Sequence, residues 1–117
     1  MESRTLTLFY PSKGEDMTDV IYQVKEVVAA YYKVPVMVLE SKSARHREVV
    51  EAKFMLCYIL SKNCEVAQKD ITKLVGYTHH TSILHAVRTT EDRIACKYDP
   101  QHRVAYYTIL MNLSEIS

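Results

Sequence analysis

The segment 79–88, HHTSILHAVR, gathers side chains that could hold a metal, catalyse a reaction or contact a nucleic acid. Two histidines, a threonine and a serine open a stretch with helical spacing, and a third histidine follows. Zinc sites typically use H-E-x-x-H spacing or paired cysteines, and neither pattern occurs in this chain. Adjacent histidines on a helix also point about 100° apart. The pattern argues against a metal site, and we expect no metal and no other cofactor.

Cysteine chemistry is not expected either. The three cysteines, Cys57, Cys64 and Cys96, are odd in number and show no C-x-x-C spacing. Such cysteines are typical of reduced thiols that pack as small hydrophobic groups in an intracellular protein. Cys57 lies in the most apolar stretch, where burial should raise the pKa of its thiol and suppress the nucleophilic thiolate. The sequence therefore predicts a protein that is not an enzyme.

The composition predicts one domain built from helices. The chain has 117 residues, of which 48% are hydrophobic and 25% are charged, the profile of a globular protein with one core. Two glycines and three prolines leave little punctuation for a many-stranded sheet. No apolar run approaches the roughly 18 residues that a membrane span needs, and the N-terminus lacks the pattern of a secretory signal. We therefore expect a cytoplasmic protein without a membrane partner.

Charge is unevenly distributed along the chain, although the net charge is only +1. Residues 41–88 contain eight basic and four acidic side chains, together with four of the five histidines. Residues 1–40 and 89–117 are both slightly acidic. A basic segment between acidic ones is typical of a surface that meets nucleic acid, but a solvated helix face gives the same pattern. Charge alone does not decide between these interpretations.

Hydrophobic spacing divides the chain into an N-terminal arm at 1–15 and a helical domain at 16–117. The expected helices start near Asp16, cover 47–62 and 67–75, run from Thr78 to about Lys97, and start again after Asp99. The second of these is the most apolar, so it should be the central and mostly buried helix. A short helical turn within 34–41 should bring Val38 and Leu39 to the core. The fold class is therefore all-α, with five or six helices.

The same spacing predicts which residues of three helices face inward. They are Val20, Val24, Val27, Val28 and Tyr31 in the first helix, Ile71, Leu74 and Val75 in the short one, and Ile83, Val87, Thr90 and Ile94 in the helix after it. Each set recurs at intervals of three or four residues, which places its members on one side of a helix.

In the last helix, Asp99 is expected as the cap and Pro100 at the first helical position. Its predicted inward stripe consists of Val104, Tyr107, Leu110 and Met111. Three further apolar residues lie off that stripe, at Ile109, Leu113 and Ile116. This helix therefore offers a possible contact surface for a protein partner.

A short helix, a glycine, a tight turn and a longer helix make up residues 67–97, the order of a helix-turn-helix. In that motif the second helix enters the major groove of DNA with its N-terminal residues on the base edges. Ile83 and Val87 should pack inward, which exposes the first turn at 79–82. Histidine and serine can hydrogen-bond to base edges there, and the threonine methyl can contact thymine. Helical hairpins that bind no DNA share this pattern, so the motif alone leaves both possibilities open.

Three motifs in register resemble the C-terminal DNA-binding domain, domain IV, of the bacterial chromosomal replication initiator DnaA. HTSILHAVR at 80–88 is similar to the family signature DHTTVxHA. VAAYYKVPVMVLESKSARHREVVEAK at 28–53 is similar to the family block VAxYY…L.SK.R.R.VV.AR, and DITKLVG at 70–76 lines up with the turn IGxxFGG. The resemblance covers about 17–95, and it implies a helix-turn-helix domain that binds double-stranded DNA.

The resemblance also implies roles for single residues. His80 and Thr81 fall where the family reads bases in the major groove. Arg45 falls on the arginine that enters the adjacent minor groove, where a cationic side chain suits the negative potential of A/T-rich DNA. Lys53 takes the place of a basic residue at the phosphate backbone. Other residues expected at or beside the DNA are Lys69, Thr78, His79, Ser82, His85 and Arg88.

Several of these residues have an ordinary alternative. A surface charge without a partner would account equally well for Arg45, Lys53, Lys69 and Arg88 if the family match is set aside. The chain also departs from the family pattern at five positions, which are Phe54, Tyr77, Thr78, His79 and Thr89. The first two replace a glutamine and the second glycine of the turn. His79 replaces an aspartate, and one changed base contact costs about 1–3 kcal/mol, which is enough to shift the preferred sequence away from the TTATNCACA-type box of the initiator.

The sequence contains no G-x-x-x-x-G-K-[ST] motif, so no nucleotide is expected as a ligand. We expect a free-standing domain that reads double-stranded DNA and regulates replication or transcription. The alternative is a protein-interaction module that kept the fold without specific DNA reading. A basic patch on one surface would favour the first function, and scattered basic residues would favour the second.

Overall fold

The computed structural model describes residues 17–41, 46–77 and 79–116. The expected N-terminal arm and the candidate residues Arg45 and Thr78 lie outside these ranges. The described helices are α1 (Met17–Tyr32), the 3-10 helix η2 (Val36–Glu40), α2 (Arg47–Lys62), α3 (Gln68–Val75), α4 (His80–Ala95) and α5 (Gln101–Ile116). The predicted all-α fold is confirmed. In the described part of the chain, no helix combines the length and the hydrophobicity needed to cross a membrane.

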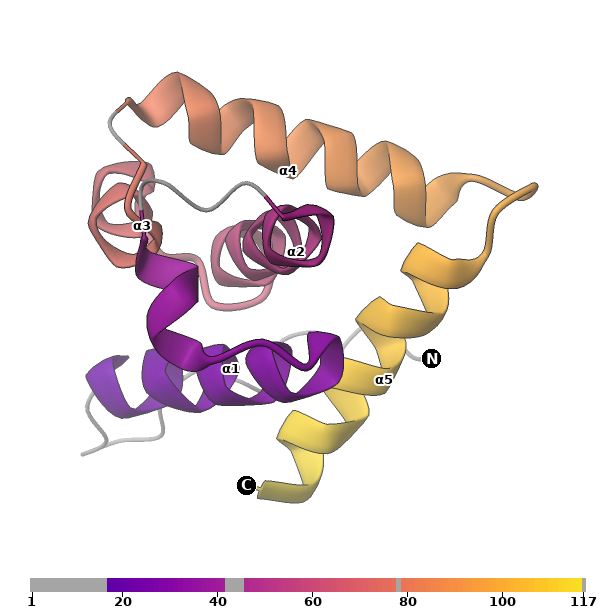
Figure 1. The fold of residues 1–117 in the computed structure, drawn as a ribbon, viewed down its shortest axis with the longest axis horizontal. Helices are drawn as coiled ribbons and strands as arrows, with labels where there is room; N and C mark the ends of the chain where they lie inside the picture. Colours follow the sequence, from indigo (N-terminus) through magenta and orange to yellow (C-terminus); the bar gives the residue numbers. More distant parts are fainter. Residues whose placement is uncertain (1–16, 42–45, 78, 117) are drawn as a thin grey trace.

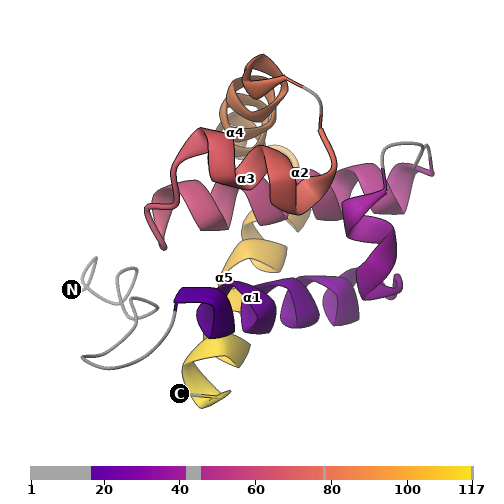
Figure 2. The same cartoon turned by 90° about the vertical axis from the view of Figure 1, so that its left-hand side faces the viewer.

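The helix α2 lies at the centre of the fold. Figure 1 looks almost along its axis, with α4 on one side, α1 on the other, α3 beside it and α5 crossing the far edge. Eight of its sixteen residues are buried, which agrees with the prediction that 47–62 is the central helix. The central helix α2 therefore supports both helices of the helix-turn-helix pair, α3 and α4. Figure 2 shows α4 almost end-on above the α2 and α3 layer.

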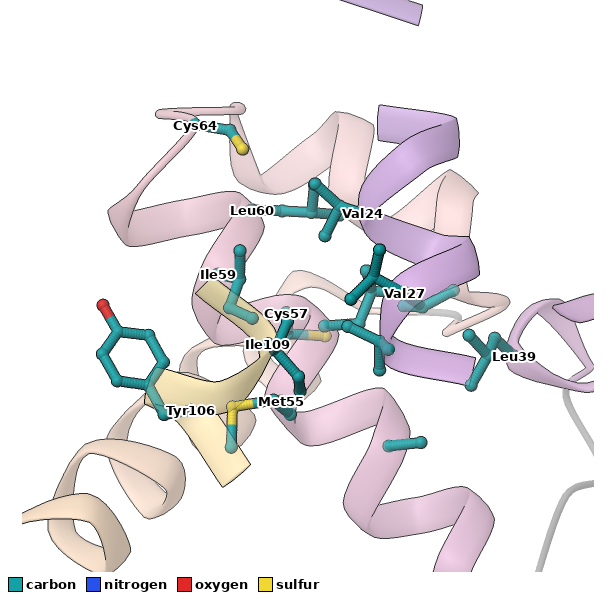
Figure 3. Packing of buried hydrophobic residues seen from close by; sticks show 14 of the residues in the cluster. Val24, Val27, Leu39, Met55, Cys57, Ile59, Leu60, Cys64, Tyr106 and Ile109 are labelled. Atoms are coloured by element: carbon teal, nitrogen blue, oxygen red, sulfur yellow. The ribbon is translucent and has the colours of Figure 1, made fainter. Parts of the chain in front are cut away.

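The core is one cluster of buried apolar side chains to which all the described helices contribute, and Figure 3 shows part of it, around α1, α2 and α5. Val24 and Val28 from α1 and Ile71 and Val75 from α3 are fully buried, as the spacing predicted. Leu74, Val87 and Ile94 are half-buried and pack against the same cluster. Burial raises the pKa of the Cys57 thiol to about 12, consistent with a packing role for this cysteine.

The 3-10 helix η2 packs against one end of the core. Leu39 is fully buried, as expected. Val38 is only half-buried, and Val36 packs against the core cluster in its place. The prediction that Val38 reaches the core is therefore wrong. A 3-10 helix has three residues per turn, so Val36 and Leu39, three positions apart, lie on the same side.

The inward face predicted for α5 is mostly wrong. Leu110 is buried, but Val104, Tyr107 and Met111 are 55%, 48% and 65% exposed. The buried stripe instead contains Ala105, Tyr106, Ile109, Leu110 and Leu113. Ile109 and Leu113 therefore belong to the core and are not available to a partner. The side chain of Ile116 lies outside the described set.

A buried polar contact helps to fix this rotation of α5. The hydroxyl of Tyr106 donates a hydrogen bond to Oδ1 of Asn63 at the end of α2, at 3.0 Å. The Tyr106 ring also packs edge-on against Tyr58, with 5.3 Å between ring centroids. A buried phenol needs a hydrogen-bond partner, and Asn63 supplies it only when Tyr106 faces inward. Periodicity alone could not find this contact, because both sides of α5 are apolar.

Candidate nucleic-acid interface

The turn between α3 and α4 depends on a left-handed glycine. Gly76 has φ +75°, the conformation that ends a helix after its last turn, as predicted. A Cβ atom at this position would collide with the backbone carbonyl of Glu40 and would lie 2.8 Å from its carbon. The turn therefore rests directly against the end of η2, and Figure 2 shows η2 beside the connection between α3 and α4.

The N-terminus of α4 is exposed and has no side-chain cap. His79 precedes the helix in an extended conformation, with φ −125° and ψ 145°, and makes no capping hydrogen bond with its side chain. Its carbonyl accepts a hydrogen bond from the Ser82 amide at 3.1 Å. The first turn of α4 contains no acidic residue. A helix N-terminus of this kind presents backbone N–H groups and partial positive charge to an anion.

Thr81, Ser82 and His85 come together around a shallow hollow of about 310 Å³ at the start of α4. Phe54 from α2 and Tyr77 from the turn form its remaining wall. Thr81 and His85 are exposed and Ser82 is half-buried. Three predicted candidates therefore share one surface, where hydroxyl and imidazole groups stand beside two aromatic rings.

The Phe54 ring contacts two other side chains beside this hollow. Its ring meets the His85 imidazole edge-on, with 5.8 Å between centroids and 89° between the ring planes. The Arg93 guanidinium lies over the same ring at 5.6 Å from its centroid, within the range of a cation–π contact. Phe54 and Tyr77 were absent from the candidate residues proposed from sequence. Both residues depart from the family pattern, and this was the signal available in the sequence.

Lys53 requires a correction. Its side chain was assigned to the phosphate backbone, but the residue is only 2% exposed. The ammonium donates a hydrogen bond to the Ser41 carbonyl and lies 5.1 Å from the centroid of the Tyr77 ring. Burial lowers the pKa of this ammonium, an effect that the nearby Cys57 sulfur partly offsets. Because the ammonium is engaged within the domain in this structure, Lys53 is not among the phosphate contacts that we propose.

The remaining candidates are distributed differently. Lys69 on α3 and Arg88 on α4 are exposed. Arg45 and Thr78 lie outside the described residues, and of His80 only the backbone is described, as the first residue of α4. Within the described part of the chain, no three histidine, cysteine or acidic side chains are grouped as metal ligands would be.

The match to a protein family decides what this helix pair is. Residues 16–89 match the family described as bacterial dnaA protein helix-turn-helix. The chain belongs to this family. A search of curated proteins found no match. The match to the dnaA helix-turn-helix covers more than half of the chain and includes α3 and the N-terminal part of α4, so the chain contains a DNA-binding domain of this type.

Proposed function

We propose that this dnaA-type domain reads the sequence of double-stranded DNA with the N-terminal turn of α4. The observation that carries the proposal is the surface formed by Thr81, Ser82 and His85 at an uncapped helix start. In helix-turn-helix proteins this part of the second helix reaches the base edges in the major groove. The surface is polar and free of acidic groups in its first turn, as contact with DNA requires.

Each group of this surface suits a different part of the DNA. The methyl group of Thr81 suits the methyl of thymine, and its hydroxyl suits a base edge or a phosphate. The backbone N–H groups at the start of α4 suit a phosphate, which would fix the register of the helix. His79 and His85 can each donate or accept a hydrogen bond in the neutral form. Arg88 and Lys69 would then contact flanking phosphates.

The proposed DNA-contacting surface also includes residues whose side chains the structure does not describe. His80 follows His79 at the start of α4 and would point into the groove next to Thr81. Thr78 precedes both in the sequence and would lie beside the DNA, and Arg45 would enter the adjacent minor groove. We propose regulation of replication or transcription as the role of such binding, because both act through a protein that occupies defined sites.

Replacing Thr81 by alanine should relax base preference without removing a phosphate contact. We expect the sequence motif selected from a randomised duplex pool to lose information at one or two adjacent positions, since a lost base contact costs about 1–3 kcal/mol. The slope of log affinity against log salt should stay within about 0.3 of its original value, because the charge is unchanged. Selection with sequencing and binding titrations at several salt concentrations measure both quantities.

Ser114→Ala provides the matched control, because Ser114 is an exposed hydroxyl residue on α5, away from α4. It should leave the selected motif unchanged. An unchanged motif for Thr81→Ala as well would show that Thr81 reads no base. An equal loss of affinity on every duplex, with the selected motif unchanged, would instead assign Thr81 to the phosphate contacts.

A protein-interaction module is the second candidate function, and the outer side of α5 favours it. Val104, Tyr107 and Met111 are exposed at positions three and four apart, so they form one apolar stripe. The candidate partner surface is therefore this stripe and does not include Ile109 and Leu113, for which the sequence predicted a partner contact. DNA reading remains the first proposal because the polar start of α4 belongs to the part of the chain that matches the family.

A further inference from the structure

The buried ammonium of Lys53 has no role in the proposed reading surface, although the residue lies directly behind that surface. Lys53 belongs to α2 and is next to Phe54, which lines the hollow at the start of α4. Burial of a lysine is costly unless its ammonium has partners. The partners here are a backbone carbonyl and an aromatic ring, and each belongs to a different segment of the chain.

Both segments meet at the turn of the helix-turn-helix. The carbonyl belongs to Ser41, immediately after η2, and the ring belongs to Tyr77, immediately after Gly76. The backbone of Glu40 and Ser41 packs against Gly76 so closely that a Cβ atom would not fit. The Glu40 carboxylate is in turn paired with the buried ammonium of Lys25 on α1. A connected set of contacts therefore runs from α1 through η2 to Gly76 and Tyr77, which follow α3.

We propose that Lys53 is a positioning residue that fastens the turn of the helix-turn-helix to the end of η2 and so sets where α4 begins. Lys53 joins three elements, since its backbone is part of α2, its hydrogen bond holds the η2 end and its charge lies against Tyr77. Loss of the ammonium would release Tyr77 and the wall of the hollow that it shares with Thr81 and Ser82. The expected effect of Lys53 on DNA binding rests on the proposed function. The contacts that hold the turn do not, because they are a property of the free protein.

The first test uses the free protein and needs no DNA. Lys53→Met keeps the aliphatic side chain and removes the ammonium. Backbone amides of 39–41 and 76–82 should exchange with solvent about tenfold faster in this variant, while amides in the middle of α5 should keep their rates. Lys62→Met is the matched control, because Lys62 is an exposed lysine on the same helix, and its exchange pattern should not change.

A uniform increase in exchange throughout the core would overturn the proposal, since it would mean that Lys53 only stabilises the domain as a whole. Unchanged exchange at either of the two segments would overturn it as well, because the fastening must act on both. A double variant that adds Tyr77→Leu should have little further effect on exchange at 76–82, since the two side chains act through the same contact.

The second test measures DNA binding by Lys53→Met on the duplex that the unmodified protein prefers and on a randomised duplex pool. We expect affinity for the preferred duplex to fall about tenfold while the salt slope is unchanged, because no phosphate contact is lost. A slope lower by about 0.9 would place the ammonium on a phosphate and overturn the proposal. If the unmodified protein discriminates no sequence, the proposed function fails, and the exchange experiment still decides the positioning role.

Discussion

Substituting Gly76 by alanine should destabilise the domain by at least about 2 kcal/mol, from left-handed strain of about 1–2 kcal/mol and a backbone collision. Gly76 has φ +75°, and its Cβ would meet the Glu40 carbonyl, which belongs to the backbone and cannot rotate away. Thermal unfolding should show a melting temperature lower by roughly 10 °C. Because the turn must then separate from η2, binding to DNA should weaken as well.

Two further variants separate the causes of this loss. Gly76→Asn tests the collision, because asparagine adopts positive φ readily but still carries a Cβ. We expect it to be nearly as unstable as Gly76→Ala. Lys33→Ala is the matched control, since Lys33 has φ +60° and is exposed after α1, and its stability should change by less than about 0.5 kcal/mol. A stable Gly76→Asn protein would show that φ alone governs this position.

The pair Ile109→Ala and Met111→Ala should differ in stability by about 2–4 kcal/mol, because only the first removes atoms from a closed core. Ile109 is fully buried, whereas Met111 is 65% exposed. We expect Ile109→Ala to lose about 2–4 kcal/mol and Met111→Ala less than about 0.5 kcal/mol, measured by urea unfolding. The inward stripe inferred from the sequence predicts the opposite order for these two residues.

The two variants therefore test the rotation of α5 directly. Equal losses would mean that both sides of α5 are covered, for example by a partner or a second copy of the chain. A larger loss for Met111→Ala would reverse the described packing. Tyr107→Phe serves as a further control, since Tyr107 is 48% exposed and loss of its hydroxyl should have little effect.

Most of the fold could be predicted from local signals. The central helix α2 followed from an apolar run that left few polar positions for solvent. The end of α3 followed from Gly76, because a left-handed residue after a helical pattern is a local requirement of the backbone. The failure at α5 has a physical reason. Tyr106, Ile109 and Leu113 compete with Val104, Tyr107 and Met111 as apolar stripes, and a contact with Asn63, far away in sequence, settles the choice.

The candidate site was predictable in its location but not in the direction of every side chain. Thr81, Ser82 and His85 share one surface because they follow one another on a helix whose inward residues were assigned correctly. Lys53 was misplaced because its position on α2 fits either direction, and a basic residue is assigned to the surface by default. Only the three-dimensional neighbours, the Ser41 carbonyl and the Tyr77 ring, show that it points inward.

Specific binding of duplex DNA by the unmodified protein tests the central claim most directly. Fluorescence anisotropy would compare the duplex that the protein selects most strongly from a randomised pool with the pool itself, at about 50 mM and about 150 mM salt. We predict saturable binding at both salt concentrations, with the single sequence preferred at least about tenfold at the higher one. Weak binding to both duplexes that disappears at the higher salt would contradict sequence reading and leave only attraction to phosphates.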